Sequence, residues 1–410
     1  MVCELGLVCA EGHDPYANLA LEKWLLDHAV PGRVVLYLWQ NARTVVIGRN
    51  QSALAEVRVA ELEAAGGRLA RRHSGGGAVY HDLGNLNFTF VARREDFDVA
   101  RQTEVVLAAV RACGVDAERT GRNDLVVAED AGDGAAVAAA DGPAGSPAGE
   151  KCAAAGETPA APAAGRKFSG HAYYLGAEAC YHHGTLMVDV DAAAMGRYLR
   201  PSAQKLRSKG VASVRSRVAN LAELAPGLTV RALAEALAAA FGREYGLPVA
   251  RLAAPGEPGG PDPAELAALT CEFASRAWVF GDGRALGHVA SGRFAWGGAT
   301  LRYDLDRDKG DCHQCHGHIA ECALDSDGLD ADFLAAVPAL LRGCAAEPTA
   351  VEGALLAAAG ADPARATMAR DLATLVDGST GRGSFAPVPN DPKKGSSGPV
   401  PNDPPGRRDA

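Results

Sequence analysis

The sequence lacks a long apolar segment. None of its 410 residues belong to an uninterrupted apolar run of about 18, the length that marks a membrane-spanning helix. The opening residues, MVCELGLVCAEGHD, place no basic residue ahead of a sustained apolar run, as a secretory signal would. The sequence therefore predicts a cytoplasmic protein with no membrane partner.

The sequence also has fewer basic than acidic residues, and its cysteines follow no disulfide pattern. Lys and Arg number 41 against 50 Asp and Glu, a net charge of -9, which argues against a general nucleic-acid binder. The 10 cysteines are scattered along a long chain and form no compact disulfide framework. We expect free thiols and no nucleic-acid partner.

Apolar residues make up 48% of the chain and charged residues 22%, so the bulk is globular, with room for two or three domains. Helical periodicity predicts helices over 15–30, 105–113 and 231–245. The β-branched runs at 33–39 and 43–49 predict strands joined as a hairpin through 40–42.

Two further strands show period-two alternation. Leu86, Phe88 and Phe90 share one face of the first, while in the second Leu186, Val188 and Val190 lie opposite Thr185, Met187 and Asp189. Hairpins mixed with helices, without strict βαβ alternation, predict an α+β domain with a mixed, largely antiparallel sheet.

Composition predicts the domain boundaries. The first domain covers 1–250, and its segment 131–164 is Ala, Gly and Pro with too few large apolar residues to order, so we expect a disordered insertion. The segment 251–263 is a Pro/Gly linker to a small α+β domain at 264–375. The tail at 376–410 repeats PVPNDP and is expected to be flexible.

The stretch RRHSGGGAVYHDLGN, residues 71–85, holds three consecutive glycines. No Gly-Lys-Ser/Thr follows them and a strand comes next, which excludes a Walker loop and a dinucleotide fingerprint. The glycines either form a hairpin turn or present backbone N–H groups to an anion, with Arg72 beside them as a forked donor.

Three other motifs bear polar groups suited to phosphate chemistry. Asn123 and Asp124 open a strand in TGRNDLVV, where they offer Mg²⁺ ligands or a helix or turn cap. Lys167 lies in a short glycine-bounded loop of GRKFSGHAYY, as a solvated lysine or a catalytic charge. His182 and His183 begin a strand and are expected to be a half-buried polar pair.

In this order and combination, the motifs resemble the lipoate-protein ligase family of the biotin and lipoate ligase superfamily. The similarity rests on YANLALEKWLL, TVVIGRNQS, RRHSGGGAVYHDLGN, GRNDLVV, GRKFSGHAYY, HHGTLMVDVD and KLRSKGVASVRSRVANL. It covers residues 14–225 apart from the insertion, and FAWGG at 294–298 resembles a motif of the family's accessory domain.

The resemblance implies a biotin/lipoate ligase-like α/β-type catalytic domain followed by an accessory domain that moves during the reaction. It also implies ATP, Mg²⁺ and lipoate: lipoate's carboxylate attacks the α-phosphate to give lipoyl-adenylate, and a lysine amine of an acceptor then forms the amide. The implied acceptors are lipoyl domains of 2-oxoacid dehydrogenase complexes and the glycine-cleavage H protein.

The resemblance also implies roles for individual residues. Lys167 matches the family's catalytic lysine, which contacts both the lipoyl carbonyl and the phosphate. Asp124 would hold Mg²⁺ with ATP, with Asn123 in support. His81 and His183 would line the lipoate pocket, and neither is assigned as a general base. The residues implied for ATP binding are Arg72, Gly75, Gly76, Gly77, Ala78, Val79, Tyr80 and Lys167.

Two alternatives remain open at this point. An octanoyl or lipoyl amidotransferase of the same superfamily would use a cysteine thioester instead of ATP, and Cys180 is the residue to test for it. A non-catalytic lipoate- or metal-binding protein would instead use Cys312, Cys315, His316 and His318. The C-x-x-C-H form of that cluster suits haem attachment or zinc, and without a second pair a metal-free hairpin loop is the simpler interpretation.

Overall fold

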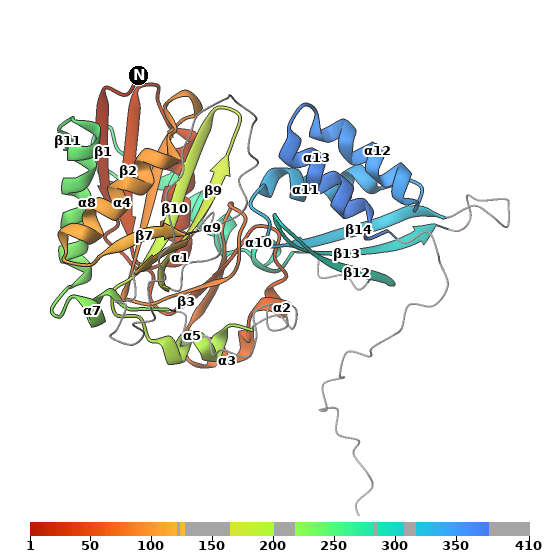
Figure 1. Ribbon diagram of the computed structural model, residues 1–410, viewed down its shortest axis with the longest axis horizontal. Helices are drawn as coiled ribbons and strands as arrows, with labels where there is room; N and C mark the ends of the chain where they lie inside the picture. The colour runs from red at the N-terminus through yellow and green to blue at the C-terminus, as the bar shows by residue number, and fades with distance from the viewer. Residues whose placement is uncertain (121–123, 128–164, 201–217, 282–285, 307–316, 377–410) are drawn as a thin grey trace, which may run out of the picture. The chain divides into compact units, whose positions relative to one another are not determined.

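The structure is a computed structural model that describes residues 1–120, 124–127, 165–200, 218–281, 286–306 and 317–376. The chain divides into the units Met1–Gly378 and Ser379–Ala410, and the second lies outside the described residues. So do the segment 131–164, where we predicted a disordered insertion, and the predicted tail. The fold is α+β, as the sequence predicted (Figure 1).

A large mixed sheet forms the centre of the N-terminal part (Figure 1). Its order is β11-β1-β2-β6-β10-β9-β8-β7. The pairs β1–β11 and β1–β2 are parallel and the other five are antiparallel, which confirms the predicted mixed, largely antiparallel sheet. Its strands are β1 (Glu4–Cys9), β2 (Arg33–Trp39), β6 (Asn85–Arg93), β7 (Ala117–Thr120), β8 (Asp124–Val127), β9 (Arg166–Leu175), β10 (Ala179–Met187) and β11 (Val249–Arg251).

One face of this sheet is covered by helices α4 (Val99–Ala112) and α8 (Val230–Tyr245), which lie side by side across it (Figure 1). Leu86, Phe88 and Phe90 of β6 join Leu186 of β10 in the core beneath these helices. The predicted alternation is confirmed on β6 and for Leu186 of β10, but β10 ends at Met187, and Val190 packs in another cluster together with Met187 instead of continuing the face of Leu186. The alternate residues of β6 and β10 face the other side of the sheet.

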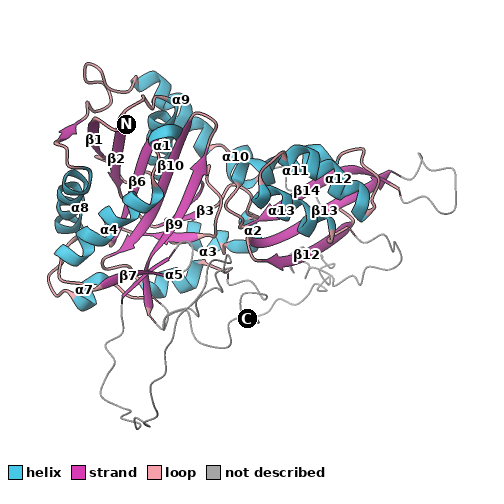
Figure 2. Ribbon diagram, turned by 45° about the horizontal axis from the view of Figure 1, so that its top comes forward, coloured by secondary structure: helices cyan, strands magenta, loops and turns pink. Residues whose placement is uncertain are grey.

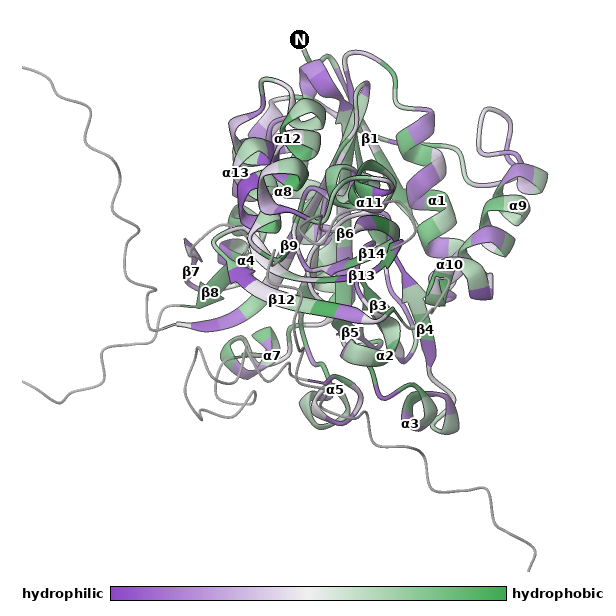
Figure 3. Ribbon diagram, turned by 90° about the vertical axis from the view of Figure 1, so that its right-hand side faces the viewer, coloured by the Kyte–Doolittle hydropathy of each residue, from purple (hydrophilic) through white to green (hydrophobic). Residues whose placement is uncertain are grey.

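The opposite face packs against α1 (Pro15–Asp27) and α9 (Pro263–Ala274), coloured cyan in Figure 2. Helix α1 begins where the sequence suggests, because the Asp14 carboxylate accepts hydrogen bonds from the backbone N–H groups of Tyr16 and Ala17 and Pro15 occupies the first turn. Figure 3 shows the mainly apolar colouring of β1, as expected for a strand covered on both faces.

A second sheet holds the glycine stretch. It consists of β3 (Thr44–Ile47), β4 (Arg68–Arg71) and β5 (Val79–His81) in the order β4-β3-β5. The predicted hairpin between 33–39 and 43–49 is therefore wrong, because β2 pairs with β1 and β6 while β3 pairs with β4 and β5. Two short adjacent strands do not specify their partners; long-range burial does.

The C-terminal part has its own antiparallel sheet, β12 (His288–Phe294), β13 (Gly297–Asp306) and β14 (His318–Ser326), packed on α11 (Ala331–Leu341), α12 (Pro348–Ala359) and α13 (Pro363–Ala373). Alternating colours along β12 in Figure 3 match its half-buried pattern. The boundary at 251–263 stays a prediction; Phe273 of α9 and Trp278 of α10 (Arg276–Phe280) pack in the cluster around α1.

The remaining described helices are short connections: α2 (Ala53–Glu56), α3 (Val59–Ala64), the 3₁₀ turn η1 (Arg94–Asp96), α5 (Ala192–Tyr198) and α7 (Leu221–Leu224). Within the ranges that the structure describes, no helix has the length and apolar composition needed to cross a membrane.

Candidate active site

A cavity of about 410 Å³ lies over the sheet face opposite α4 and α8. Its size falls within the range of sites for small organic ligands. Strands of both N-terminal sheets contribute to the wall, and so do Arg293, Trp296 and Leu329 of the C-terminal part. Most of the site residues expected from the sequence meet here.

The floor of the cavity is one row of paired residues across five neighbouring strands. Trp39 pairs with Asn87, Asn87 with Thr185, Thr185 with Gly170, and Gly170 with Asp124. Directly paired residues point to the same face of a sheet, and all five line the cavity. At a strand spacing of about 4.8 Å, the row is about 19 Å long.

Lys167 and Asp124 form the outer end of this row. The Lys167 Nζ lies 2.6 Å from Asp124 Oδ1, and the side chains are 40% and 47% exposed. A Cβ atom on Gly170 would lie 2.9 Å from this Nζ, so the glycine leaves room for the ammonium group. The pair places a positive charge over the floor while both groups stay in contact with solvent.

The position of Lys167 corrects the sequence prediction, because the residue lies in strand β9 and not in a loop. Lys167 and Gly170 are three residues apart, so a regular strand would direct them to opposite faces. The register between β8 and β9 shifts, with Leu125 opposite Ser169 and Val126 opposite Lys167, so that Phe168 is the extra residue. This bulge turns Lys167 toward the cavity face.

The glycine loop, residues 74–77, connects β4 and β5 above the floor. Arg72 donates from Nη2 to the carbonyl oxygens of Gly75 and Gly77 at 2.7 and 2.9 Å. Because a peptide's N–H and C=O point in opposite directions, the N–H groups of Gly76 and Ala78 are directed away from Arg72. The Gly76 N–H donates to the Gly328 carbonyl at 3.2 Å.

Arg72 itself is almost fully buried, and its Nε and Nη1 also donate within the protein, to Ser74 Oγ and the Val46 carbonyl. Burial lowers the pKa of Arg72 to about 10, so it remains charged at neutral pH. The guanidinium lines the cavity and holds the loop in shape. Gly76, with φ of 90°, takes a backbone conformation that favours glycine.

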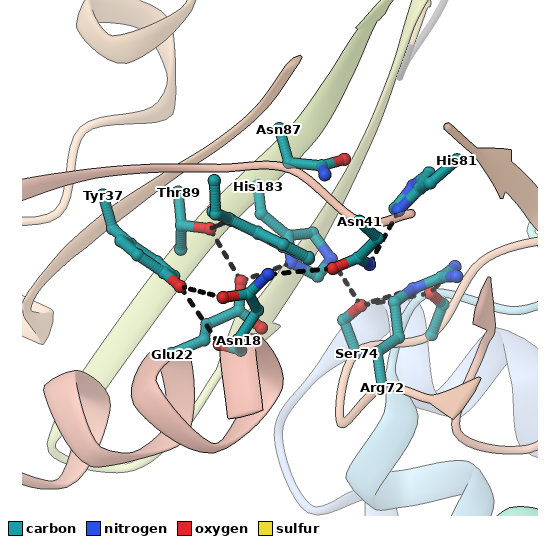
Figure 4. A network of polar contacts seen from close by, with 12 residues as sticks. Asn18, Glu22, Tyr37, Asn41, Arg72, Ser74, His81, Asn87, Thr89 and His183 are labelled. Carbon is teal, nitrogen blue, oxygen red and sulfur yellow. Dashed lines mark hydrogen bonds and ion pairs between the residues drawn. The ribbon is translucent and has the colours of Figure 1, made fainter. Parts of the chain in front are cut away.

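A buried polar network forms the inner end of the site (Figure 4). Glu22 Oε1 accepts hydrogen bonds from Thr89 Oγ1 at 2.7 Å and from His183 Nδ1 at 2.8 Å. His183 Nε2 lies 2.8 Å from Ser74 Oγ. The order Ser74–His183–Glu22 is that of a hydrolase triad, but Ser74 is 0% exposed and held by Arg72. The hydrogen-bonded series Ser74–His183–Glu22 therefore connects α1 to the glycine loop.

The other histidines near the cavity are uncharged at neutral pH. Burial lowers the pKa values of His81 and His171 to about 3, with further lowering by the neighbouring cations Arg72 and Lys167 respectively. His182 is fully buried, and burial lowers its pKa as well. His182 and His183 lie inside β10 and are more deeply buried than the predicted half-buried pair.

The described cysteines lie outside the cavity wall. Cys180 is 1% exposed, and its thiol donates to the Gly176 carbonyl at 3.8 Å. Burial raises the pKa of Cys180, which opposes formation of a thiolate.

The cavity thus brings together many of the residues that the sequence indicated: Arg72, Gly76, Gly77, Ala78, Val79, His81, Asp124, Lys167 and His183. Gly75 does not line the cavity and packs against Gly328 and Leu329, and Tyr80 faces the other side of the small sheet, against Tyr198. Asn123, Cys312, Cys315 and His316 lie outside the described residues. His318 begins β14, opposite Asp306.

Sequence reasoning missed the floor residues Trp39, Asn87, Thr185 and Gly170, and it missed Glu22. For Asn87 and Thr185 a signal was present, since they alternate with the apolar residues that were assigned to the core face. Over the described ranges no three His, Cys, Asp or Glu side chains gather into a group that could hold a metal ion.

Known proteins share this fold. The model of the lipoyl protein ligase A/B catalytic domain matches residues 14–242. LipL1 of P. falciparum, solved in complex with lipoate, aligns with a TM-score of 0.68 at 20% identity, over 90% of this chain and 98% of that one. A bipartite lipoate protein ligase from Thermoplasma acidophilum, solved with its E2 lipoyl domain, gives 0.52 at 24% identity, over 70% and 98%.

The architecture shares its fold with these solved lipoate-binding and ligase structures. Because the family match covers more than half of the chain, this chain belongs to the lipoyl protein ligase A/B catalytic domain family. The predicted fold class is confirmed by the structural alignments. Attachment of lipoyl groups is the general activity that this membership supports.

Proposed function

We propose that the protein is an ATP-dependent lipoate-protein ligase. In the first step, a lipoate carboxylate oxygen attacks the α-phosphorus of ATP, pyrophosphate leaves, and lipoyl-adenylate forms. In the second, the ε-amine of an acceptor lysine attacks the acyl carbon; AMP leaves, the nitrogen loses a proton, and an amide results. Family membership supports lipoyl attachment, and LipL1, which shares the fold, was solved with lipoate.

The observation that carries the proposal is the placement of Lys167. Its ammonium group stands at the outer end of the cavity floor, on the same face as the glycine loop. A fatty carboxylate lying along the floor would end beside this cation, which would stabilise the negative charge that builds up on the α-phosphate. Lys167 would contact both the lipoyl carbonyl and the phosphate.

For ATP we propose the loop Gly75–Tyr80 together with Arg72. The N–H groups of Gly76 and Ala78, turned away from Arg72, would meet phosphate oxygens, as in an anion-binding nest. Gly75 and Tyr80 would act by shaping the two ends of the loop. ATP would have to displace the Gly328 carbonyl from the Gly76 N–H.

Mg²⁺ would be held by Asp124, with Asn123 in support. One carboxylate is enough when ATP supplies the other oxygens, because Mg²⁺ keeps several water and phosphate ligands. The Asp124 carboxylate opens strand β8 at the outer end and is 47% exposed, so it can be reached by a metal-bound nucleotide.

The rival amidotransferase needs a reactive cysteine in the acyl site. Across the described part of the chain the cavity wall holds none, and the buried Cys180 thiol has a raised pKa. We therefore favour activation by ATP. Lipoyl domains are the proposed acceptors, along with glycine-cleavage H protein, in keeping with the E2 lipoyl domain that accompanies the archaeal neighbour.

The deciding experiment is lipoate-dependent exchange of labelled pyrophosphate into ATP, with the purified chain and no acceptor. We expect exchange in the wild type and in Cys180→Ala, and at least a hundredfold slower exchange in Lys167→Ala. Absence of exchange in the folded wild type, with acyl transfer from an acyl thioester that Cys180→Ala abolishes, would instead establish the amidotransferase.

A further inference from the structure

Two buried polar atoms in the cavity wall have no hydrogen-bond partner among the described residues. They are His81 Nε2 and Asn87 Nδ2. His81 is 3% exposed and Asn87 1% exposed, and both residues line the cavity. Buried polar groups in proteins are nearly always hydrogen-bonded. Two unpaired polar atoms in the wall of one ligand cavity therefore indicate that the ligand supplies their hydrogen-bond partners.

A chain of hydrogen bonds sets the proton on His81 (Figure 4). The Gln40 carbonyl can only accept, so the Asn18 group 2.8 Å away is its amide nitrogen, which also donates to Asn41 Oδ1 at 3.0 Å. Asn41 Nδ2 is then left facing His81 Nδ1 at 3.1 Å and donates to it. Neutral His81 must therefore carry its proton on Nε2, the unpaired atom.

His81 is uncharged, because burial lowers its pKa to about 3. The Nε2–H group is thus a donor and cannot act as an acceptor. The Asn87 amide shares one hydrogen bond of 2.9 Å with the Asn85 amide, which leaves the other polar atom of the Asn87 amide without a partner. The inner end of the cavity therefore offers a fixed donor on His81 and an adjacent amide group with one unpaired polar atom.

The distance from Lys167 to these groups fits a medium-length acyl chain. Asn87 lies two strands from Gly170, over which the Lys167 ammonium stands, a separation of about 10 Å. An extended octanoyl chain, with C–C bonds of about 1.5 Å in zigzag, spans about 9 Å. A carboxylate at Lys167 would place the far end of such a chain near Asn87 and His81.

We propose that His81 and Asn87 select acyl groups whose far end bears a hydrogen-bond acceptor, such as the disulfide ring of lipoate, over groups that end in methyl, such as octanoate. Asn41 and Asn18 are positioning residues that hold His81 as a donor. The inference rests on the proposed function, since it assumes that the acyl carboxylate lies at Lys167. A ring sulfur is a weak acceptor, whereas a methyl group leaves the buried polar groups unpaired.

The test compares the binding of three acids to the full chain by calorimetry: lipoate, octanoate and the lipoate analogue in which a cyclopentane ring replaces the disulfide ring. The analogue keeps the ring and removes the acceptor. We expect wild type to bind lipoate about tenfold more tightly than either of the other acids. In His81→Phe the preference over the analogue should fall below about threefold.

His28→Phe is the matched control, because it makes the same change at an exposed histidine outside this cavity and should keep the preference. Asn87→Leu, which keeps the number and branching of the side-chain heavy atoms, should also reduce the preference, and it provides the test if His81→Phe fails to fold. The ¹⁵N signals of the His81 ring report the tautomer independently of binding, and we expect a protonated Nε2 and an unprotonated Nδ1.

A protonated Nδ1, or equal binding of lipoate and the cyclopentane analogue by the wild type, would overturn the inference. If lipoate-dependent pyrophosphate exchange were intact in that case, the proposed function would remain supported and only the inference about His81 and Asn87 would fail. Binding of none of the acids together with no exchange would overturn both.

Discussion

The two ends of the cavity differ in how far their charged side chains are exposed to solvent. At the outer end, Lys167 and Asp124 form an ion pair whose side chains are 40% and 47% exposed. At the inner end, Glu22, Ser74 and Arg72 are at most 5% exposed. His183 is hydrogen-bonded to Glu22 and Ser74, and Arg72 donates to Ser74. The outer charges can exchange partners during a reaction, whereas the inner ones are held in a single arrangement.

The difference follows from solvation. An exposed pair contributes at most about 1 kcal/mol to stability, because water competes for both charges. A buried polar group that loses its partner costs about 1–3 kcal/mol, and more when it is charged. The outer end should therefore determine rate and the inner end stability, and variants at the two ends can test this division.

The largest effect on stability is expected at Glu22. Glu22→Leu removes the acceptor of two buried donors, Thr89 Oγ1 and His183 Nδ1, and should lower the free energy of unfolding by about 4 kcal/mol. Urea unfolding measures this. Glu22→Gln keeps an acceptor oxygen and should recover most of the loss, while Glu178→Leu, at an exposed carboxylate, should change it by no more than about 0.5 kcal/mol.

The loop between the two ends should respond in both rate and stability. In Gly76→Leu the leucine backbone must adopt φ of 90°, and its Cβ would lie only 2.9 Å from Arg72 Nη2. We expect a stability loss of about 1–3 kcal/mol and at least a hundredfold slower pyrophosphate exchange, because the loop amides would move. Normal exchange by the folded variant would show that the loop does not bind the nucleotide.

Acid should weaken the fold through the buried histidines. His81 and His171 have pKa values of about 3 in the folded state, below the unfolded value of about 6.5. Between these limits the unfolded chain binds more protons, so stability is retained above pH 6.5 and falls as pH decreases, by up to about 1.4 kcal/mol per pH unit for each histidine. Urea midpoints from pH 7 to 5 measure the slope, and His171→Gln should reduce it; a flat profile would contradict neutral burial.

The smallest change in stability is expected at the outer end. Lys167→Ala breaks only a half-exposed ion pair, so the free energy of unfolding should stay within about 0.5 kcal/mol of wild type while exchange collapses. A loss as large as that of Glu22→Leu would mean that the two ends do not differ in the way described.

Much of the catalytic architecture could be predicted from the sequence. The helices at Pro15–Asp27 and Val230–Tyr245 were predicted from local periodicity, and the strand that follows the glycines was expected as well. The strand Arg68–Arg71, which precedes the glycines, was not predicted. The motif resemblance indicated Lys167, Asp124, His81 and His183, which meet at one cavity.

Partnerships between distant segments escaped prediction. The strands at 33–39 and 43–49 are neighbours in sequence but belong to different sheets, since their partners are strands more distant in the chain. Glu22 looked like an ordinary polar residue of an amphipathic helix, and only its contact with His183, 161 positions away, reveals it as a buried acceptor.

The sequence by itself determined many of the local elements, the glycine loop and the candidate site residues, because periodicity and motif spacing are properties of short segments. Only the tertiary structure decided where those side chains point. The bulge opposite Val126 turns Lys167 to the cavity face, and the contacts of Asn18 and Asn41 set the proton of His81. Register and protonation depend on long-range neighbours, and these exist only once the chain has folded.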